Sequence, residues 1–443
     1  MSHPLSALFI DADGFFASCE EHFDPTLRGR PVGVVPMVAE TTCCIASNYA
    51  AKAFGVKTGT SVRDARRQCP GIVLVEAKPA EYVKIHHRII EAVGMRPHDV
   101  GFDEYYGCYP AQKEITQSVD KRRFPKLSVD QEQAEAYKEL GMGHSLVHGW
   151  KGGKTEEVSA IKSTEDMARA DKGLADFTVA KLKELAKGGQ PFFLEHAFMK
   201  VHCDNFANPD FEGLSAAKYP YKDALAEVDL HVGTIVKTLE EAGLLENTLV
   251  FLTSDNGPQM DAWPDAGYTP FRGAKGTTWE GGVRVPGIAY WKGMIQPGRQ
   301  SDDVFDLMDL FGTSLKLAGV PTEKLPTDRY YDFVDQTSFL LADDGKSNRE
   351  TVYFWWGKEL MACRMHEYKA HIKVILPQAP HMHIDMATIQ DVGLAPWFFN
   401  LYLDPKEEMT VGHRLDPWMA SVAGKLKAHG ATFKKYPPKQ IGL

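Results

Sequence analysis

The chain reads LENTLVFLTSDNGPQ at residues 245–259 and, after a short loop, GYTPFRGAKGTTWEGGVRVP at residues 267–286. The apolar run from Thr248 to Leu252 predicts a buried parallel strand. A Gly-Pro pair ends this strand and leaves Asp255 and Asn256 at its carboxyl end, where open α/β sheets place their sites. Two adjacent oxygen ligands suit a hard cation, Ca²⁺ or Mg²⁺, although an Asx-turn that only closes the strand explains the same dipeptide.

A glycine-rich segment follows, with one lysine at its centre. Lys275 lies 20 residues after Asp255 (275 − 255), in a loop that can bring backbone N–H groups and an ammonium close to an anion. Together with WEGGVRVP at 279–286, the pattern resembles the C-terminal signature of the type I sulfatases, in the alkaline-phosphatase superfamily. The resemblance implies an α/β fold with a mixed sheet flanked by helices. It also implies metal ligation by Asp255 and Asn256 and sulfate contact by Lys275.

Composition restricts the class of protein. The 443 residues allow one large core or two domains, and 44% hydrophobic with 25% charged residues is ordinary for a soluble globular protein. A net charge of −9 argues against a dominant nucleic-acid footprint. The opening MSHPLSAL lacks a basic n-region, and no apolar run approaches the roughly 20 residues that span a bilayer. Seven cysteines without paired spacing favour a reducing compartment. We therefore expect a cytoplasmic protein with no membrane partner.

The first 94 residues carry a second pattern. ALFI at 7–10 predicts a strand that delivers an aspartate, and DADGFFASCE, SNYAAKAFGV and PGIVLV follow in order. This series resembles the palm and fingers of the Y-family (DinB/UmuC-like) translesion DNA polymerases, and it implies an α/β fragment of that type. The resemblance implies four site residues: Asp11 as the first catalytic-metal carboxylate, Phe16 as the steric gate, and Tyr49 and Lys52 as contacts of the incoming triphosphate.

The polymerase pattern is incomplete. Two-metal phosphoryl transfer needs further carboxylates. Asp103 and Glu104 lie near the expected place, but GFDEYYG around them resembles a sulfatase segment instead. We therefore expect no working polymerase, and DNA as a partner only through this N-terminal fragment.

The remaining residues continue the sulfatase resemblance. PFFL at 191–194 predicts a core strand that leads to His202, where sulfatases carry a histidine that contacts the sulfate; His196 and Lys200 are weaker candidates. Ser163 predicts the N-cap of one helix, and residues 219–244 predict a second, amphipathic helix. Alternating apolar segments after residue 350 predict a small antiparallel sheet. Three tryptophans there suit either a pocket for an aromatic or sugar ester or, more simply, the core: Trp355, Trp356 and Trp397.

Parts of an active sulfatase are missing from the sequence. The family carries an Asp-Asp pair and a Cys- or Ser-x-Pro-Ser-Arg motif whose first residue becomes formylglycine, and neither occurs here; Asp11 and Asp13 imitate the pair only poorly. We therefore expect no formylglycine. The predicted domains are residues 1–94, 95–325 and 326–443. The functional hypotheses are a sulfate-ester hydrolase with impaired activity, an incomplete translesion polymerase, and a non-catalytic fusion product.

Overall fold

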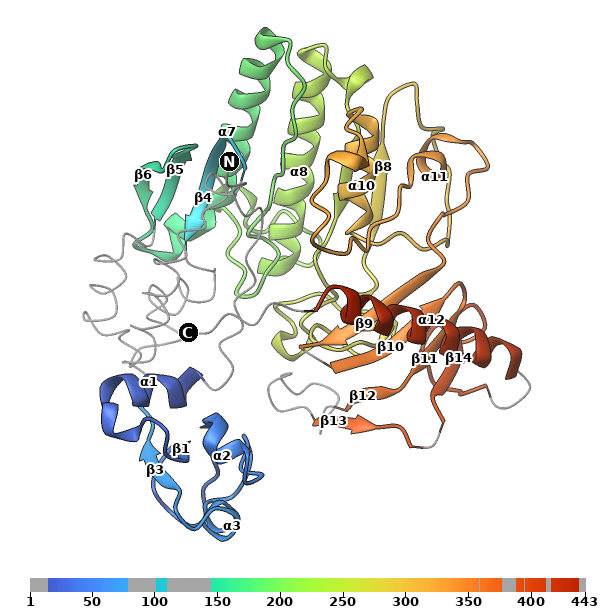
Figure 1. Cartoon of the computed structure of the whole chain (residues 1–443). Coiled ribbons are helices and arrows are strands. Elements are labelled where there is room, and N and C mark those ends of the chain that lie inside the picture. Colours follow the sequence, from blue (N-terminus) through green and yellow to red (C-terminus); the bar gives the residue numbers. More distant parts are fainter. Residues whose placement is uncertain are drawn as a thin grey trace. The chain divides into compact units, whose positions relative to one another are not determined.

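The computed structural model describes residues 15–78, 101–109, 145–357, 359–376, 388–393, 395–411 and 416–437. Contacts divide the chain into two compact units, Met1–Met167 and Ala168–Leu443, and each unit is described by itself. Figure 1 shows the helices and strands, coloured along the sequence. The predicted strand at 7–10, the aspartates Asp11 and Asp13, and the predicted boundary near Gly94 lie outside the described residues.

A three-stranded sheet organises the start of the first unit. Its order is β2-β1-β3, with β1 and β3 parallel and β1 and β2 antiparallel. The strands are β1 (Val32–Val35), β2 (Ala46–Ser47) and β3 (Val73–Glu76), and the helices are α1 (Phe15–Phe23), η1 (Pro25–Leu27), α2 (Tyr49–Lys52) and α3 (Val62–Gln68). Val34 packs toward α1, whereas its neighbour Val35 packs toward α2 and α3, because successive side chains in a strand point to opposite faces. The segment GRPVGVVP at 29–36 therefore contains β1, with helices on both faces of its sheet.

The first unit contains a second, antiparallel sheet of order β4-β5-β6. Its strands are β4 (Glu104–Tyr109), β5 (Ser145–Trp150) and β6 (Lys154–Ala160). Glu104 lies on β4, where its carboxylate contacts His148 Nε2 at 2.6 Å. Glu104 therefore has a structural role in this sheet.

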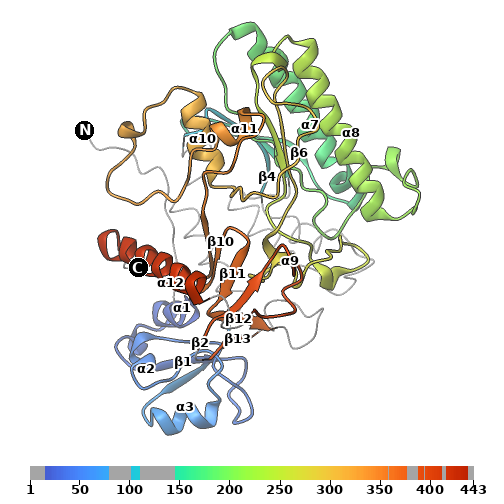
Figure 2. The same cartoon turned by 90° about the vertical axis from the view of Figure 1, so that its right-hand side faces the viewer.

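Two long helices dominate the second unit, and they lie side by side (Figures 1 and 2). The helix α7 spans Thr164–Gly188, and its predicted N-cap is confirmed because Ser163 Oγ accepts a hydrogen bond from Asp166 N at 3.1 Å. The helix α8 spans Pro220–Glu241. Among the described helices, none has both the length and the apolar character that crossing a membrane requires.

The buried face of α8 is largely polar. The apolar Leu225 of this helix is 43% exposed. The buried positions include Asp223, Glu227 and His231, which recur every four residues along one side of the helix. Asp223 and Glu227 bond the 199–215 segment, so the helix uses this face to hold a loop as well as to pack.

The strand that opens the central motif is shorter and more exposed than predicted. It is β7 (Val250–Thr253), and it pairs antiparallel with β8 (Gly287–Tyr290). The expectation of a buried parallel strand is therefore wrong. The connection between the two strands carries only η5 (Met260–Ala262) and α9 (Glu280–Val283), and a chain that returns without a crossover helix re-enters its sheet antiparallel. The strand predicted at 191–194 is likewise not observed, since these residues belong to no helix or strand.

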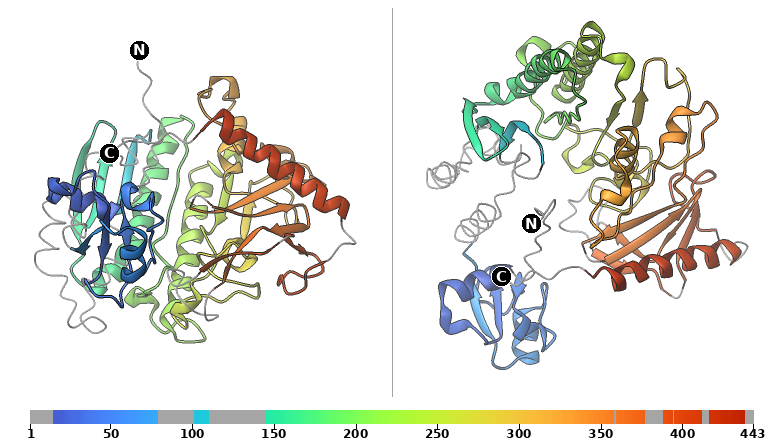
Figure 3. Two further views of the ribbon diagram at one scale, coloured as in Figure 1. Left: turned by 60° about the horizontal axis from the view of Figure 1, so that its bottom comes forward. Right: turned by 45° about the horizontal axis from the view of Figure 1, so that its top comes forward.

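The predicted C-terminal antiparallel sheet is confirmed, with order β14-β11-β10-β9. Its strands are β9 (Thr351–Trp356), β10 (Glu359–Met365), β11 (Tyr368–His371) and β14 (Trp397–Asn400), and a separate hairpin pairs β12 (Lys373–Leu376) with β13 (Thr388–Asp391). The helix α12 (Asp416–Lys435) covers one face of the sheet (Figure 3). Val422 of this helix belongs to one apolar cluster with Cys363 and Phe398.

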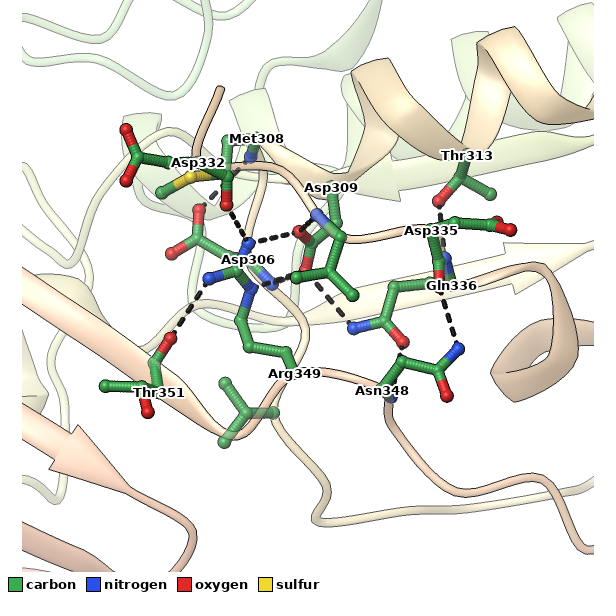
Figure 4. A network of polar contacts seen from close by, with 12 residues as sticks. Asp306, Met308, Asp309, Thr313, Asp332, Asp335, Gln336, Asn348, Arg349 and Thr351 are labelled. Atoms are coloured by element: carbon green, nitrogen blue, oxygen red, sulfur yellow. Dashed lines mark hydrogen bonds and ion pairs between the residues drawn. The ribbon is translucent and has the colours of Figure 1, made fainter. Parts of the chain in front are cut away.

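A buried ion pair joins α10 (Asp309–Leu317) to the segment before β9. The Arg349 guanidinium donates to both carboxylate oxygens of Asp309 and to the carbonyl oxygens of Asp332 and Thr351 (Figure 4). Asp309 also accepts from Gln336, which lies just before α11 (Thr337–Leu341). A bidentate, buried Arg–carboxylate pair fixes geometry more firmly than a surface pair. The remaining short helices of this unit are η3 (Pro209–Phe211), η4 (Leu245–Asn247) and η6 (Thr322–Lys324).

Candidate functional site

The turn after β7 and the lysine loop are bonded to each other through their backbones. Gly257 N donates to Gly282 O, and Lys275 N donates to Pro258 O, both at 2.9 Å. A Cβ atom on Gly257 would lie 1.9 Å from the carbonyl oxygen of Gly281, which no side chain tolerates. The glycine therefore allows the close approach of two backbones, and it holds the Asp255–Asn256 turn against the loop that carries Lys275.

The two predicted sulfate contacts, Lys275 and His202, meet. Lys275 Nζ lies 3.3 Å from His202 Nε2. The other ring nitrogen of His202, Nδ1, contacts the carbonyl oxygen of Cys203, which can only accept, so Nδ1 carries the proton. Nε2 then presents its lone pair to the lysine ammonium. The Lys275 ammonium thus supplies a positive charge suited to an anion, and the neutral imidazole beside it accepts one of its hydrogen bonds.

Buried charges hold the segment that carries His202. Asp171 on α7 accepts from Met199 N at 2.7 Å and Lys200 N at 3.2 Å. The Lys200 ammonium is buried and donates to Glu227 on α8 at 3.0 Å. Lys200, a weaker candidate for the site, thus has the contacts of a structural residue that fixes the loop.

His196, the other weaker candidate, lies in a similar structural position. Its Nδ1 lies 2.8 Å from the hydroxyl of Thr178 on α7. Burial, helped by the nearby His231, lowers the pKa of His196 to about 4. The imidazole is therefore neutral at pH 7 and packs between the helix and the loop.

A buried ionic network lies behind the lysine loop. Lys369 on β11 contacts Glu280 at 2.9 Å and Glu407 at 3.3 Å, and His371 Nε2 lies 2.7 Å from Glu407. Glu407 also accepts from Glu280 N at 2.7 Å. Burial acts to raise the pKa of Glu407, but Lys369 and His371 outweigh it and hold that pKa below its usual value. The network fastens the start of α9, five residues after Lys275, to the C-terminal sheet.

Sequence reasoning missed these supporting residues. Glu280 lies within the quoted motif, but its partners Lys369 and Glu407 are 89 and 127 residues away. Asp171 and Glu227 leave a weak signal, since each is a charged residue on a helix face that otherwise packs.

The predicted cation ligands are placed at the same turn. Asp255 is exposed, and Ser254 Oγ lies 3.4 Å from its Oδ1. Ca²⁺ takes six to eight oxygen ligands, and no group of three or more His, Cys, Asp or Glu side chains in the described ranges could hold a metal ion. Asp255 and Asn256 therefore fit a hard cation by their chemistry but supply too few ligands alone.

The predicted polymerase-like residues are divided among two places in the first unit. Tyr49 begins α2 and is 70% exposed, and Lys52 Nζ lies 5.1 Å from the centre of its ring. Phe16, on α1, packs with the cluster around Val34. Asp11 lies outside the described residues, so the structure brings together only Tyr49 and Lys52.

The three tryptophans considered as pocket residues contribute mainly to packing. Trp355 contacts the rings of His429 and Phe433 on α12, and Trp397 contacts Trp279. Trp356 is 37% exposed at the end of β9. A cavity in this unit lies beside the Arg349 ion pair and contains none of the predicted site residues; it is lined by Asp303, Val304, Lys346, Ser347, Arg349, His366 and Tyr402.

Two family models match the chain. The model of the Sulfatase family matches residues 81–320, which is more than half of the 443 residues. The model of the impB/mucB/samB family matches residues 10–146. The two matches overlap at 81–146, which includes the predicted boundary near Gly94.

Relatives and solved structures agree with the first match. The steryl-sulfatase of Rattus norvegicus is 40% identical over 39% of this chain and 30% of its own length, and the N-acetylgalactosamine-6-sulfatase of Mus musculus is 40% identical over 41% and 34%. The chain thus spans about a third of these curated relatives. The crystal structure of the PsFucS1 sulfatase from Pseudoalteromonas sp. superposes with a TM-score of 0.75 at 46% identity, over 79% of this chain and 70% of that one. The predicted fold class, an alkaline-phosphatase-like α/β body with a small antiparallel sheet, is confirmed.

Proposed function

Because the chain belongs to the sulfatase family, we propose that its second unit binds sulfate esters, aryl or carbohydrate, at Lys275 and His202. The observation that supports this proposal is the 3.3 Å contact between Lys275 Nζ and His202 Nε2. Two buried ionic networks fix the loops that carry these residues, so the pair is arranged before a ligand arrives. A sulfate oxygen would replace the imidazole as the acceptor for Nζ, in a charge-assisted hydrogen bond.

Hydrolysis itself is expected to be impaired. Lys275 holds the sulfate, and His202 Nε2 is placed to accept a proton at that end of the ester. Asp255 and Asn256 would hold Ca²⁺ or Mg²⁺, which neutralises the charge of a bound sulfate. The 443 residues contain no Cys- or Ser-x-Pro-Ser-Arg motif, and covalent catalysis without its nucleophile loses most of its rate.

Binding and turnover can be measured separately. Calorimetric titration with inorganic sulfate is expected to show binding that Lys275→Ala weakens about tenfold or more, since one charge-assisted bond is lost. Lys237→Ala, which removes an exposed lysine of α8, is the matched control and should bind like the parent. Release of 4-nitrophenol from 4-nitrophenyl sulfate with Ca²⁺ should not exceed the buffer rate. Equal sulfate affinity in the Lys275 and Lys237 variants would overturn the proposed site, and substantial turnover would overturn the expected impairment.

The impB/mucB/samB match supports a second candidate function for the first unit. Tyr49 and Lys52 lie together on α2, as contacts of a nucleotide triphosphate would. Primer extension on a lesion-containing template tests this function, and we expect no product because the polymerase pattern is incomplete. Absence of sulfate binding together with absence of extension would leave the third candidate, a non-catalytic fusion product.

A further inference from the structure

Two large aromatic side chains are exposed on the loop that joins the two halves of the candidate site. Trp263 is 60% exposed and Tyr268 is 61% exposed. Their ring centres are 5.8 Å apart with an interplanar angle of 81°, so the two rings meet nearly at a right angle. Exposed aromatics of this size cost hydrophobic free energy, and such residues are enriched where ligands bind.

Two contacts join this loop to the segment that follows His202. Its first residues touch the His202 segment, since Cys203 Sγ lies 3.5 Å from Gln259 Oε1. Further along, the buried carboxylate of Asp265 accepts from Asn205 N at 2.8 Å. Trp263 therefore lies between two residues of the loop that are both bonded close to His202.

The charges around Cys203 agree with this placement. Burial is the main cause that raises the pKa of the Cys203 thiol; Asp265 and Asp261 raise it further and Lys275 lowers it. Asp261 and Asp265 belong to the loop that carries the aromatic pair, and the contacts of Gln259 and Asp265 place this loop beside the segment that follows His202.

We propose that the face of Trp263 forms a stacking platform for the pyranose ring of a carbohydrate sulfate whose sulfate group is held by Lys275 and His202, and that Tyr268, nearly perpendicular to it, forms a wall beside this platform. This inference rests on the proposed function and narrows its substrate class. The face of an aromatic ring is electron-rich and attracts the partly positive C–H groups on the flat side of a sugar ring. The exposed carboxylate of Asp261, two residues before Trp263, is placed to accept hydrogen bonds from sugar hydroxyls.

The openness of the platform favours a sugar over a sterol. Both rings are more than half exposed, so they offer flat faces and not the enclosed apolar walls that a large hydrocarbon ligand requires. A sugar buries one face on the Trp263 ring and keeps its hydroxyls in water. A steroid sulfate is accordingly the competing ligand in the test.

The test is a calorimetric comparison of four ligands on the full chain: inorganic sulfate, galactose 6-sulfate, galactose and estrone sulfate. Galactose 6-sulfate is expected to bind about tenfold more tightly than inorganic sulfate, the gain that one good aromatic contact gives. Trp263→Ala should remove this gain and leave the affinity for inorganic sulfate unchanged. Lys275→Ala should weaken both sulfated ligands together.

Control variants separate stacking from folding. Trp263→Phe keeps an aromatic face and should retain most of the gain in affinity for galactose 6-sulfate over inorganic sulfate. Tyr268→Ala should independently reduce this gain. Tyr330→Ala removes another tyrosine that is about half exposed, 51%, and should change nothing. Equal affinity for galactose 6-sulfate and inorganic sulfate, or a gain that survives Trp263→Ala, would overturn the platform. Tighter binding of estrone sulfate than of the sugar sulfate would overturn the sugar as its ligand. If the parent does not bind inorganic sulfate, that result would instead count against the proposed function.

Discussion

At the scale of single residues, the close approach at Gly257 gives the sharpest prediction. Its Cβ position lies 1.9 Å from Gly281 O, so Gly257→Ala forces two backbones apart and should destabilise the second unit by about 3 kcal/mol. Gly233→Ala, at an exposed position in α8 with no atom within 4 Å of the added Cβ, is the control. It should stabilise the unit by about 0.5–1 kcal/mol, since alanine favours helix. Urea unfolding measures both, and similar effects of the two changes would contradict this account of the glycine.

The sequence was informative for residues that belong to one short motif, and much less so for their partners. Lys275 and His202 could be predicted because each stands at a fixed place in a recognisable pattern, and the structure brings them together. The role of Gly257 was predicted only in part: it follows the strand, but its contact with Gly281 depends on a chain reversal that no local pattern shows. Trp263 was overlooked because exposure cannot be read from composition.

At the scale of elements, the buried network predicts how α9 is attached to β11. Lys369→Met leaves Glu280 and Glu407 buried without their cation, and it should cost about 3–5 kcal/mol at pH 7. The pKa of Glu407 lies below its ordinary 4.5 in the parent, so the parent loses this stabilisation as the pH falls through and below that value. Without Lys369 that pKa rises, and acidification restores stability to the variant. Urea unfolding should therefore show that the parent and Lys369→Met differ less in free energy of unfolding at pH 4.5 than at pH 7.

The control for this change is Lys237→Met, which removes a solvent-exposed partner of Glu241 on α8. A surface pair of this kind contributes little, so stability should hardly change at either pH. If the free energies of unfolding of Lys369→Met and the parent differ equally at the two pH values, the network does not titrate as described.

Element types were predicted where the periodicity is local, and element directions were not. The helices α7 and α8 and the alternating C-terminal strands follow from spacing within each segment. The direction of β7 relative to its neighbour, and the absence of a strand at 191–194, depend on which partners are present in the sheet. A strand needs a paired neighbour, and the sequence of one segment does not show whether it has one.

At the scale of the whole molecule, the division into two units predicts how the chain unfolds. Each unit has its own apolar clusters, such as Val35 with Ala65 in the first and Leu182 with Leu239 in the second, so calorimetry should show two transitions. A ligand stabilises only the unit that binds it, and sulfate should therefore raise the midpoint temperature of one transition and leave that of the other unchanged. Gly257→Ala should lower the midpoint temperature of the transition that sulfate raises. A single transition that responds to both would mean that the two units unfold as one.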